Sequence, residues 1–329
     1  MTLDPVRLDR LDRALAFLGA RLEHDRPMGP LSTYRVGGPA RRFVAVADAD
    51  ELVHIATALA EIAPVQGDDV LVVGRGSNLL VADRGVEALV LQLGEGFAGI
   101  EVSGEQVRAG GATSLPVLAR RTVAAGLTGF EWAVGVPGSV GGAVRMNAGG
   151  HGADMAASLI GVRVVDLSTG EDVEVAASAL DLGYRRSSLR RAQVVVHADI
   201  GLSAGDTAAG EATLADIVRW RREHQPGGQN AGSVFTNPDG DSAGRLIDRA
   251  GAKGRRVRTA VVSDKHANFI QADPGGSADD VAALMASVRR RVMDHSGVEL
   301  HPETVMVGFT AEELAQVTGP LAGPTRDAT

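Results

Sequence analysis

The amino-acid sequence predicts an α+β protein that is built around glycine-rich ligand-binding loops. A strand at 42–47, a helix at 50–61 and a short apolar strand at 70–73 lead into Val-Gly-Arg-Gly-Ser-Asn at 73–78. A loop that follows the carboxyl end of such a strand is where ligands bind in α/β units. A second glycine-dense segment, which carries almost no charge, spans 129–152.

Hydrophobic periodicity and chain breakers define the remaining elements. Apolar residues recur every three or four positions from Val6 to about Leu22, which predicts an amphipathic helix. Alternation at 162–167, a Ser-Thr-Gly turn and a return at 172–175 predict a β-hairpin. The breaker-rich segment 225–232 is a candidate domain boundary, and the small, polar tail from Ala311 is expected to be poorly ordered. Further strands are expected at 88–93, 106–109, 194–202, 260–262 and 305–307, and further helices at 115–125, 209–222, 243–250 and 278–295.

Composition bounds the kind of protein. The chain has 329 residues, which is long enough for two domains or one large composite, and 44% of them are hydrophobic. A net charge of −8 argues against nucleic acid as the main partner. The absence of cysteine excludes disulfides, thiolate metal sites and cysteine nucleophiles, and it fits a reducing cytoplasm. We see no signal peptide and no membrane-spanning run, so we expect a cytoplasmic protein.

The two glycine clusters indicate a ligand with phosphate groups. Glycine at this density destabilises a helix or strand, but it lets backbone N–H groups approach an anion closely. One such loop is weak evidence, and two in one domain suggest a large dinucleotide. The spacing at 74–78 lacks the third glycine of a nicotinamide Rossmann fingerprint, and no acidic residue is found about 20 positions later at the end of a second strand. A Rossmann domain is therefore disfavoured.

Seven segments in a fixed order resemble one known family. They are TYRVGGPA at 33–40, VGRGSNLLV at 73–81, GVPGSVGGAVRMNAGGHG at 135–152, GYRRSSL at 183–189, AGSVFTNP at 231–238, VSDKHANFI at 262–270 and HPETVMVG at 301–308. No single segment is decisive. Together they resemble the UDP-N-acetylenolpyruvoylglucosamine reductase (MurB) family over most of the chain.

The resemblance implies a fold and a cofactor. The fold is an FAD-binding module of the vanillyl-alcohol-oxidase (PCMH) type with two subdomains, followed by an α/β substrate-binding domain. We expect these at residues 1–86, 87–222 and 223–310, with a disordered tail at 311–329. In that family the glycine loops hold the FAD pyrophosphate. The implied cofactor-binding residues are Arg35, Gly74, Arg75, Gly76, Ser77, Asn78, Leu79, Val136, Pro137, Ser139, Gly142 and Ala143.

The family reaction uses NADPH as co-substrate and reduces UDP-N-acetylglucosamine enolpyruvate to UDP-N-acetylmuramate in peptidoglycan precursor synthesis. Hydride addition to the vinyl carbon places negative charge on the substrate carboxylate. The resemblance implies that Arg185 and Glu303 stabilise this enolate and that Ser233 protonates the carbon. Arginine suits the first role because its planar fork matches a carboxylate. Each residue also has an ordinary structural explanation: a solvated basic surface, an exposed carboxylate and a turn serine.

The substrate contacts implied by the family are less uniform. They are Tyr184, Arg185, His224, Asn237 and His266. His224 stands where relatives often carry lysine, and we hypothesise that its titration near neutrality makes activity depend on pH. Thr236 and the pair Arg258-Thr259 also depart from the family pattern. The short interval between Arg185 and 225–226 favours the shorter, type II subclass.

Two other functions are also compatible with the sequence. A different FAD-dependent oxidase or dehydrogenase of the same cofactor fold would share the glycine loops but would not need Arg185, Ser233 and Glu303. A non-catalytic regulator that binds a UDP-sugar is favoured only by the lysine departures. No histidine pattern has metal-ligand spacing, so we expect no metal site. The sequence is compatible with a monomer.

Overall fold

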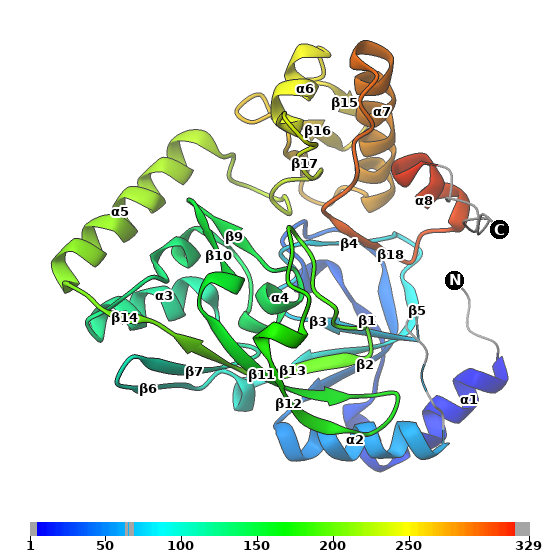
Figure 1. Ribbon diagram of the computed structural model, residues 1–329. Helices are drawn as coiled ribbons and strands as arrows, with labels where there is room; N and C mark the ends of the chain where they lie inside the picture. The colour runs from blue at the N-terminus through cyan, green and yellow to red at the C-terminus, as the bar shows by residue number, and fades with distance from the viewer. Residues whose placement is uncertain (1–4, 63–64, 66–68, 320–329) are drawn as a thin grey trace, which may run out of the picture.

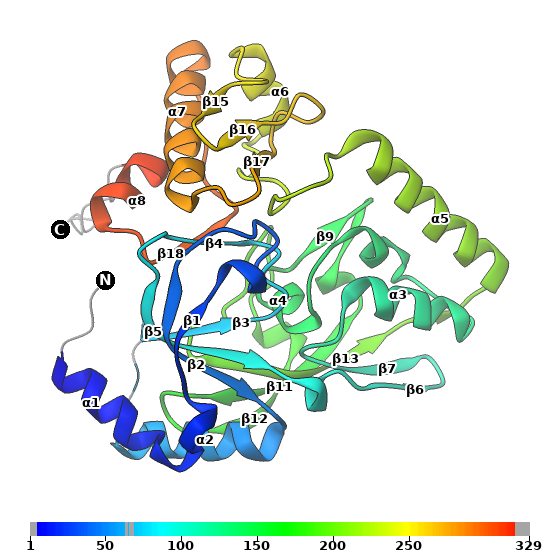
Figure 2. The same ribbon diagram turned by 180° about the vertical axis from the view of Figure 1, so that it is seen from behind.

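The computed structural model describes residues 5–62, 65 and 69–319, in which two β-sheets share a hydrophobic core. A smaller region of helices and short strands lies against one end of this pair, at the top of Figure 1, and Figure 2 shows the same arrangement from behind. The cavity described below is lined by all three parts. The fold is therefore mixed, with helices and strands interleaved along the chain, as predicted.

The first sheet contains four strands in the order β1-β2-β5-β3. Their bounds are Glu23–Pro27 for β1, Pro39–Val46 for β2, Val86–Leu93 for β5 and Val70–Val73 for β3. β2 and β5, and β5 and β3, run parallel, so the loop after β3 leaves the sheet at its carboxyl edge. The predicted helix at 50–61 is confirmed as α2 (Ala49–Ile62), where the Asp48 carboxylate accepts a hydrogen bond from the Glu51 N–H. The strand–helix–strand unit thus delivers the first glycine loop.

The helix predicted from Val6 to Leu22 is shorter in the structure. α1 covers Pro5–Ala14, and the chain then continues as 3₁₀ turns over Ala16–Arg21, within which Gly19 has φ of 55°. A residue in that left-handed conformation cannot continue an α-helix. Periodicity therefore located the apolar side chains of this segment without revealing the break.

The second sheet is antiparallel, with the order β12-β11-β13-β7-β6. Its strands are β6 (Ile100–Ser103), β7 (Gln106–Gly110), β11 (Leu159–Asp166), β12 (Asp172–Ala176) and β13 (Gln193–Gly201). The predicted hairpin is confirmed as β11 and β12. Val165 and Val194 of this sheet pack in the same core as Ile55 of α2 and Leu89 of β5. The two sheets are thus joined by buried aliphatic side chains.

Three helices accompany the second sheet: α3 (Leu115–Ala124), α4 (Val140–Arg145) and α5 (Thr207–His224). Gly126, with φ of 74°, follows α3, as the sequence predicts. Short pairs complete this part: β8 (Leu127–Thr128) with β14 (Ser203–Ala204), and β9 (Gly149–Gly150) with β10 (Ala153–Asp154). Five further 3₁₀ segments cover Gly29–Leu31, Glu95–Phe97, Glu131–Gly135, Met155–Ala157 and Ala177–Ala179.

The C-terminal region packs two helices on a small antiparallel sheet. Its elements are α6 (Ala243–Arg249), β15 (Arg256–Val257), β16 (Ala260–Val262), β17 (Ile270–Ala272) and α7 (Ala278–Ser296). The apolar face predicted for α7 is buried, with Val281 and Leu284 fully enclosed. This region is tied to the first part of the chain because β18 (Val305–Val307) pairs in parallel with β4 (Leu79–Val81). Residues far apart in sequence therefore meet at the end of the first glycine loop.

The expectation of a poorly ordered tail from Ala311 was wrong for its first part. Residues Ala311–Thr318 form α8, and Thr310 and Glu313 make a reciprocal capping box at its start. The side chain of Val317 is buried, and Glu313 pairs with Arg84. The capping box and the buried Val317 were not recognised in the sequence, because most residues of the tail are small. Residues 320–329 lie outside the described part, and no helix within it is long and apolar enough to cross a membrane.

Candidate active site

A cavity of about 750 Å³ opens between the two sheets and the C-terminal region. The two glycine-rich loops form much of its wall, at 74–79 and 135–143. Residues 231–233 and Glu303 close it from the C-terminal side. The volume lies in the range of ligand and cofactor pockets. Most of the segments that carry the sequence motifs thus surround one space, the exception being 33–40.

The first glycine loop approaches the second one closely. A Cβ atom added at Gly74 would lie 2.3 Å from Oγ of Ser139, so a larger residue would collide with the second loop. Gly76 has φ of 58°, and a Cβ there would lie 2.1 Å from the carbonyl oxygen of Leu31. Glycine is required at both positions, for close approach at one and for a left-handed turn at the other. The two loops therefore form one cradle, in which their backbones lie close together at the cavity wall.

Asn78 connects the first glycine loop with Glu303. Its side-chain amide donates a hydrogen bond of 2.9 Å to the carbonyl oxygen of Glu303, and its own carbonyl accepts one of 3.0 Å from the N–H of Val305. The parallel pairing of β4 with β18 begins at the next residue, Leu79. A strand pairing of high sequence separation thus positions Glu303 at the cavity.

Ser233 lies beside Glu303 through a second set of backbone bonds. The N–H of Glu303 donates a hydrogen bond of 2.8 Å to the carbonyl oxygen of Val234, and Phe235 forms an isolated bridge with Pro302. Ser233 and Glu303 both line the cavity. Within the described residues, the Ser233 hydroxyl makes no side-chain hydrogen bond. It is therefore available to a ligand.

Arg185 forms an ion pair with Glu303 at the cavity wall, with 2.6 Å between Nε and Oε1. The two side chains are 24% and 15% exposed. Nη2 of Arg185 also donates to the carbonyl oxygen of Gly149 at 3.3 Å. Burial raises the pKa of the Glu303 carboxyl, and the charge of Arg185 opposes this shift without cancelling it. The pair therefore holds a carboxyl group that keeps its proton to higher pH than an exposed glutamate.

The backbone that carries Arg185 is strained. Its φ is 57°, a left-handed conformation that non-glycine residues rarely adopt. Asn147 and His151, which lie inside the second glycine segment, also have positive φ, and the Asn147 amide donates to the carbonyl oxygen of Gly183 at 3.1 Å. Such strain persists where surrounding contacts enforce it, commonly at functional sites. Here it orients the guanidinium group toward the cavity.

The cavity is strongly cationic. Among the described residues that line it, one carboxylate faces five guanidinium groups, those of Arg75, Arg145, Arg185, Arg191 and Arg221. Burial and the neighbouring charge of Arg191 lower the pKa of Arg145 to about 10, and Arg145 donates to the carbonyl oxygens of Leu189 and Arg190. A buried cation without a carboxylate partner is costly unless an anion joins it. In a chain of net charge −8, this concentration of arginine selects an anionic ligand.

Comparison with known proteins gives the family. A UDP-N-acetylenolpyruvoylglucosamine reductase of Acidiphilium cryptum is 41% identical over 303 residues, which cover 92% of this chain and 96% of the relative. That of Heliobacterium modesticaldum is 42% identical over 291 residues, covering 88% and 91%. The chain belongs to the UDP-N-acetylenolpyruvoylglucosamine reductase family. It is therefore an oxidoreductase.

Family models and a solved structure agree with this placement. An FAD binding domain matches residues 40–176, and the UDP-N-acetylenolpyruvoylglucosamine reductase C-terminal domain matches residues 223–307. The crystal structure of the reductase from Thermus caldophilus superposes with a TM-score of 0.75 at 34% identity, covering 87% of this chain and 99% of that one. The predicted fold, an FAD-binding module of the vanillyl-alcohol-oxidase type followed by a substrate-binding domain, is confirmed.

Most sequence-predicted site residues of this family member line the cavity. They are Gly74, Arg75, Gly76, Ser77, Asn78, Leu79, Val136, Pro137, Ser139, Gly142, Ala143, Arg185, Ser233 and Glu303. Arg35 is exposed and does not line it. Tyr184 is also exposed and lies beside Arg185, whose guanidinium carbon is 5.3 Å from the centre of the tyrosine ring.

Three predicted substrate contacts do not line the cavity, and each makes a structural hydrogen bond. His224 donates from Nδ1 to the carbonyl oxygen of Trp220, 2.8 Å away. Asn237 accepts a hydrogen bond from the N–H of Ala243 at the start of α6. His266 accepts one from the N–H of Asn268, and burial lowers its pKa, so its imidazole is neutral at pH 7.

Sequence reasoning missed several residues that line the cavity. Arg145 and His151 lie inside the second glycine segment, whereas Trp220 and Arg221 belong to the last turns of α5. A basic last turn such as that of α5 is also explained by its favourable interaction with the helix dipole, so it does not by itself indicate a ligand site. Trp220 and Arg221 could have been found from their position in the sequence, because α5 leads directly into the segment that carries Ser233.

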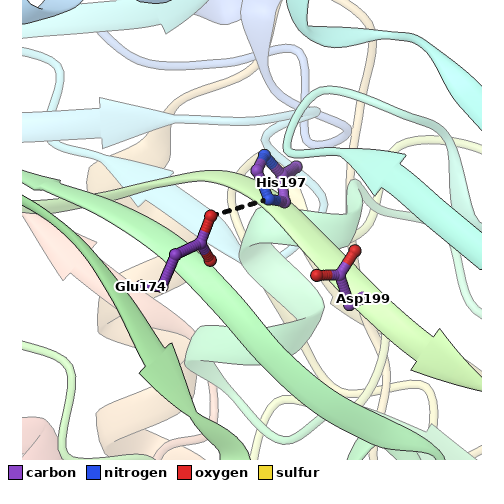
Figure 3. Close-up of side chains that lie close together, drawn as sticks. All are labelled: Glu174, His197 and Asp199. Carbon is purple, nitrogen blue, oxygen red and sulfur yellow. Dashed lines mark ion pairs between the residues drawn. The ribbon is translucent and has the colours of Figure 1, made fainter.

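A second group of side chains contains residue types that often bind metal ions, but its members already pair with one another and with an arginine. Glu174, His197 and Asp199 gather on β12 and β13, where Nε2 of His197 lies 3.4 Å from Oε1 of Glu174 (Figure 3). Both oxygens of Asp199 already accept hydrogen bonds from Arg108, at 2.7 and 2.8 Å. Burial and the charge of Arg108 lower the pKa of His197. We therefore interpret this group as an ion-pair network on the sheet.

Proposed function

We propose that the protein is an FAD-dependent reductase that uses NADPH to convert UDP-N-acetylglucosamine enolpyruvate to UDP-N-acetylmuramate, a step of peptidoglycan precursor synthesis. The observation that carries this proposal is the partly buried Arg185–Glu303 ion pair at 2.6 Å, which lines the same cavity as Ser233 and the glycine loops. This set supplies a cation, an acid and a proton donor around one space. An enolpyruvyl ether requires all three for reduction.

The residues present fit FAD. The cradle at Gly74 and Gly76 leaves no room for Cβ atoms, so backbone N–H groups can lie against a pyrophosphate. The excess of arginine in the cavity would neutralise its two charges. Residues 74–79, together with Val136, Pro137, Ser139, Gly142 and Ala143, would hold the cofactor. When bound, FAD supplies a hydride at the vinyl carbon of the substrate after accepting one from NADPH.

Arg185 stabilises the charge that develops on the substrate. When hydride reaches the terminal vinyl carbon, the electron pair of the double bond moves to the neighbouring carbon and spreads into the carboxylate. A guanidinium group remains charged throughout and donates two parallel N–H bonds to that carboxylate. Because the pair is largely buried, this interaction is stronger than it would be in water.

Glu303 acts in its protonated form. Burial raises the pKa of its carboxyl group, which favours the protonated form, and this form can donate a hydrogen bond to the same substrate carboxylate. The hydrogen bond from Asn78 to the Glu303 carbonyl fixes the backbone from which the side chain extends. Arg185 and Glu303 would therefore act together on one carboxylate.

Ser233 donates the proton that completes the reduction. A serine hydroxyl is a weak acid in water, so the step requires a strongly basic carbon within contact distance and a site that excludes water. The hydroxyl lines the cavity next to Glu303, and Gly232 before it has open space where a Cβ would stand. A ligand carbon can therefore approach Ser233 closely.

The decisive experiment separates the two half-reactions. The FAD-loaded protein is reduced with NADPH without oxygen, and the visible flavin band is followed after addition of UDP-N-acetylglucosamine enolpyruvate. We expect the oxidised band to return with formation of UDP-N-acetylmuramate, and we expect Ser233→Ala to be reduced normally but reoxidised slowly. Flavin that is reduced and not reoxidised by this substrate would indicate a different flavoenzyme. A protein that does not bind FAD would overturn the proposal.

The cofactor assignment has its own matched test. Gly74→Ala places a Cβ against Ser139, and we expect FAD affinity to fall about tenfold, because an inserted methyl group in a tight contact costs about 1–3 kcal/mol. Gly99→Ala is the control, since its Cβ would meet no atom within 4 Å. Quenching of flavin fluorescence on titration into apoprotein gives both affinities. Equal affinities would show that the cradle does not hold the cofactor.

A further inference from the structure

Three aromatic side chains gather at the rim of the cavity, none of them in the catalytic set. Trp220 on α5 is 43% exposed. The ring of His224 stacks nearly parallel to it, with 4.7 Å between ring centres and 15° between planes. The ring of His151, from the turn between β9 and β10, stands perpendicular to it at 5.1 Å. Trp220 and His151 both line the cavity. We call these three residues the aromatic wall.

The wall is held in place by specific contacts. A Cβ at Gly135 would lie 3.3 Å from Cδ2 and Nε2 of His151 and 2.9 Å from Ile217, so the imidazole lies directly against glycine backbone. The Nδ1–H of His224 donates to the carbonyl oxygen of Trp220, which fixes that ring behind the indole. Burial lowers the pKa of His151, so this ring is neutral at pH 7. The wall is therefore preorganised and presents neutral aromatic surface next to the indole.

A buried cation adjoins the wall. Arg221 follows Trp220 in the chain and lines the same cavity. Its guanidinium donates to the carbonyl oxygen of Gly135 and, at 2.6 Å, to the side-chain oxygen of Gln225. Within the described residues, neither partner carries a charge and no carboxylate pairs with Arg221. Burial lowers the pKa of Arg221, which reflects the cost of a cation that no anion offsets.

We propose that the aromatic wall stacks against the planar ring of a nucleotide that enters and leaves the cavity, while Arg221 pairs with the phosphate of that nucleotide. An aromatic surface beside an uncompensated guanidinium matches a base linked to a phosphate. The exposure of Trp220 at the rim suits an exchanging ligand and not FAD, whose pyrophosphate we assign to the glycine cradle. This inference rests on the proposed function, which supplies two such nucleotides: the nicotinamide dinucleotide and the uridine diphosphate sugar.

Binding to the FAD-loaded protein tests the inference without turnover. Dissociation constants are measured by calorimetry for NADP⁺ and for UDP-N-acetylglucosamine, with wild type, Trp220→Ala and Trp220→Phe. We expect Trp220→Ala to weaken one of the two by about tenfold or more, the range found for removal of a stacking ring, and Trp220→Phe to retain most of the affinity. Loss of NADP⁺ binding assigns the wall to the reductant, and loss of UDP-sugar binding assigns it to the substrate.

Val218→Ala is the matched control, because Val218 is exposed on the same helix but does not line the cavity. Tryptophan fluorescence gives a second measurement, since Trp132, the other tryptophan of the chain, is buried. Unchanged affinity of both ligands for Trp220→Ala would overturn the inference, as would a loss of FAD instead. Equal weakening by Phe and Ala would also overturn it, because stacking would then not be the cause. A failure of the proposed function would differ from these results, appearing as reduced flavin that the enolpyruvyl substrate does not reoxidise.

Discussion

The molecule contains two clusters in which arginines pair with acidic residues, a sheet cluster on the second sheet and a cavity cluster at the candidate active site, and the two differ in geometry. On the second sheet, Arg108 holds Asp199 through two hydrogen bonds, and Arg163 holds Asp172 at 2.9 and 2.6 Å. Glu174 and His197 lie beside them (Figure 3). In the cavity, Arg185 meets Glu303 through a single contact of 2.6 Å. The two aspartates of the sheet cluster have both carboxylate oxygens paired with arginines of the same sheet, whereas Arg185 and Glu303 line a cavity.

The pKa values of the carboxyl groups are shifted in opposite directions in the two clusters. Hydrogen bonds from Arg163 and Arg108 lower the pKa values of Asp172 and Asp199, while burial raises the pKa of Glu303 despite its arginine. The backbone differs as well. The sheet residues extend from regular strands, whereas Arg185 sits at φ of 57° in a turn. An ion pair built for stability is bidentate and unstrained. The cavity pair is instead partly buried, strained and incomplete, which are features common at functional sites.

Substitution of Arg185 tests this contrast most strongly. We expect Arg185→Met to slow reduction of the enolpyruvyl substrate by about 10²- to 10³-fold, the effect of removing one preorganised oxyanion donor. Arg185→Lys should lie between this variant and wild type, because it keeps the charge but loses the fork. Stopped-flow spectroscopy measures flavin reoxidation, and flavin reduction by NADPH should be almost unaffected.

The control for Arg185 is its neighbour in the sequence. Arg186 is exposed and lies 3.6 Å from Asp181, outside the cavity lining. Arg186→Met should therefore reoxidise like wild type. If Arg185→Met did so too, the cavity ion pair would be structural, like its counterparts on the sheet.

Glu303 gives the second prediction, which concerns pH. Because burial raises the pKa of Glu303, its protonated form persists to higher pH in the folded protein than in an exposed glutamate. If this form is the active one, the rate of substrate reduction falls as pH rises through that raised pKa. Glu303→Gln should remove this step from the pH profile and lower the rate about 10²-fold, the scale of one general acid. Single-turnover rates between mildly acidic and mildly alkaline pH measure both.

A glutamate outside the site provides the comparison for Glu303. Glu299 is exposed and pairs with Arg289, so Glu299→Gln should retain the wild-type rate and profile. A pH step that survives unchanged in Glu303→Gln would show that another group controls the titration.

Local patterns predicted the fold better than the site. Strand alternation and helical periodicity located α2, α7 and the β11–β12 hairpin because each pattern lies within one segment. They did not reveal that α1 ends at Ala14 and is followed by 3₁₀ turns, or that a capping box begins α8.

At the site, the family motifs identified Arg185, Ser233 and Glu303, which the structure brings to one cavity. Arg221 and Trp220 could not be found in this way. Their role depends on where the end of α5 lies against Gly135, which is a tertiary contact across 86 positions of sequence. Charge patterns along the chain do not show which arginines lack an acidic partner in space.

Substitution in the sheet cluster is expected to have the smallest effect, and this effect is on stability. Asp199→Asn should lower the free energy of unfolding at pH 7 by only about 0.5 kcal/mol, because Arg108 is half exposed and solvent screens the pair. The pKa of Asp199 is lowered in the folded state, so the pair stabilises above the unfolded pKa of about 4. This contribution is lost as pH falls through the lower folded value, so the difference should vanish in strong acid.

Urea unfolding at neutral and acidic pH measures the difference for Asp199→Asn, and Asp172→Asn is the parallel case on the same sheet. Both variants should keep wild-type rates of flavin reduction and reoxidation. A zinc-dependent rise in Tm that disappears in Asp199→Asn would instead mean that Glu174, His197 and Asp199 hold a metal ion. In that case the guanidinium of Arg108 would have to move away from the Asp199 carboxylate, to which two of its nitrogens now donate hydrogen bonds. The sheet cluster would then be a ligand site, as we propose for the cavity cluster.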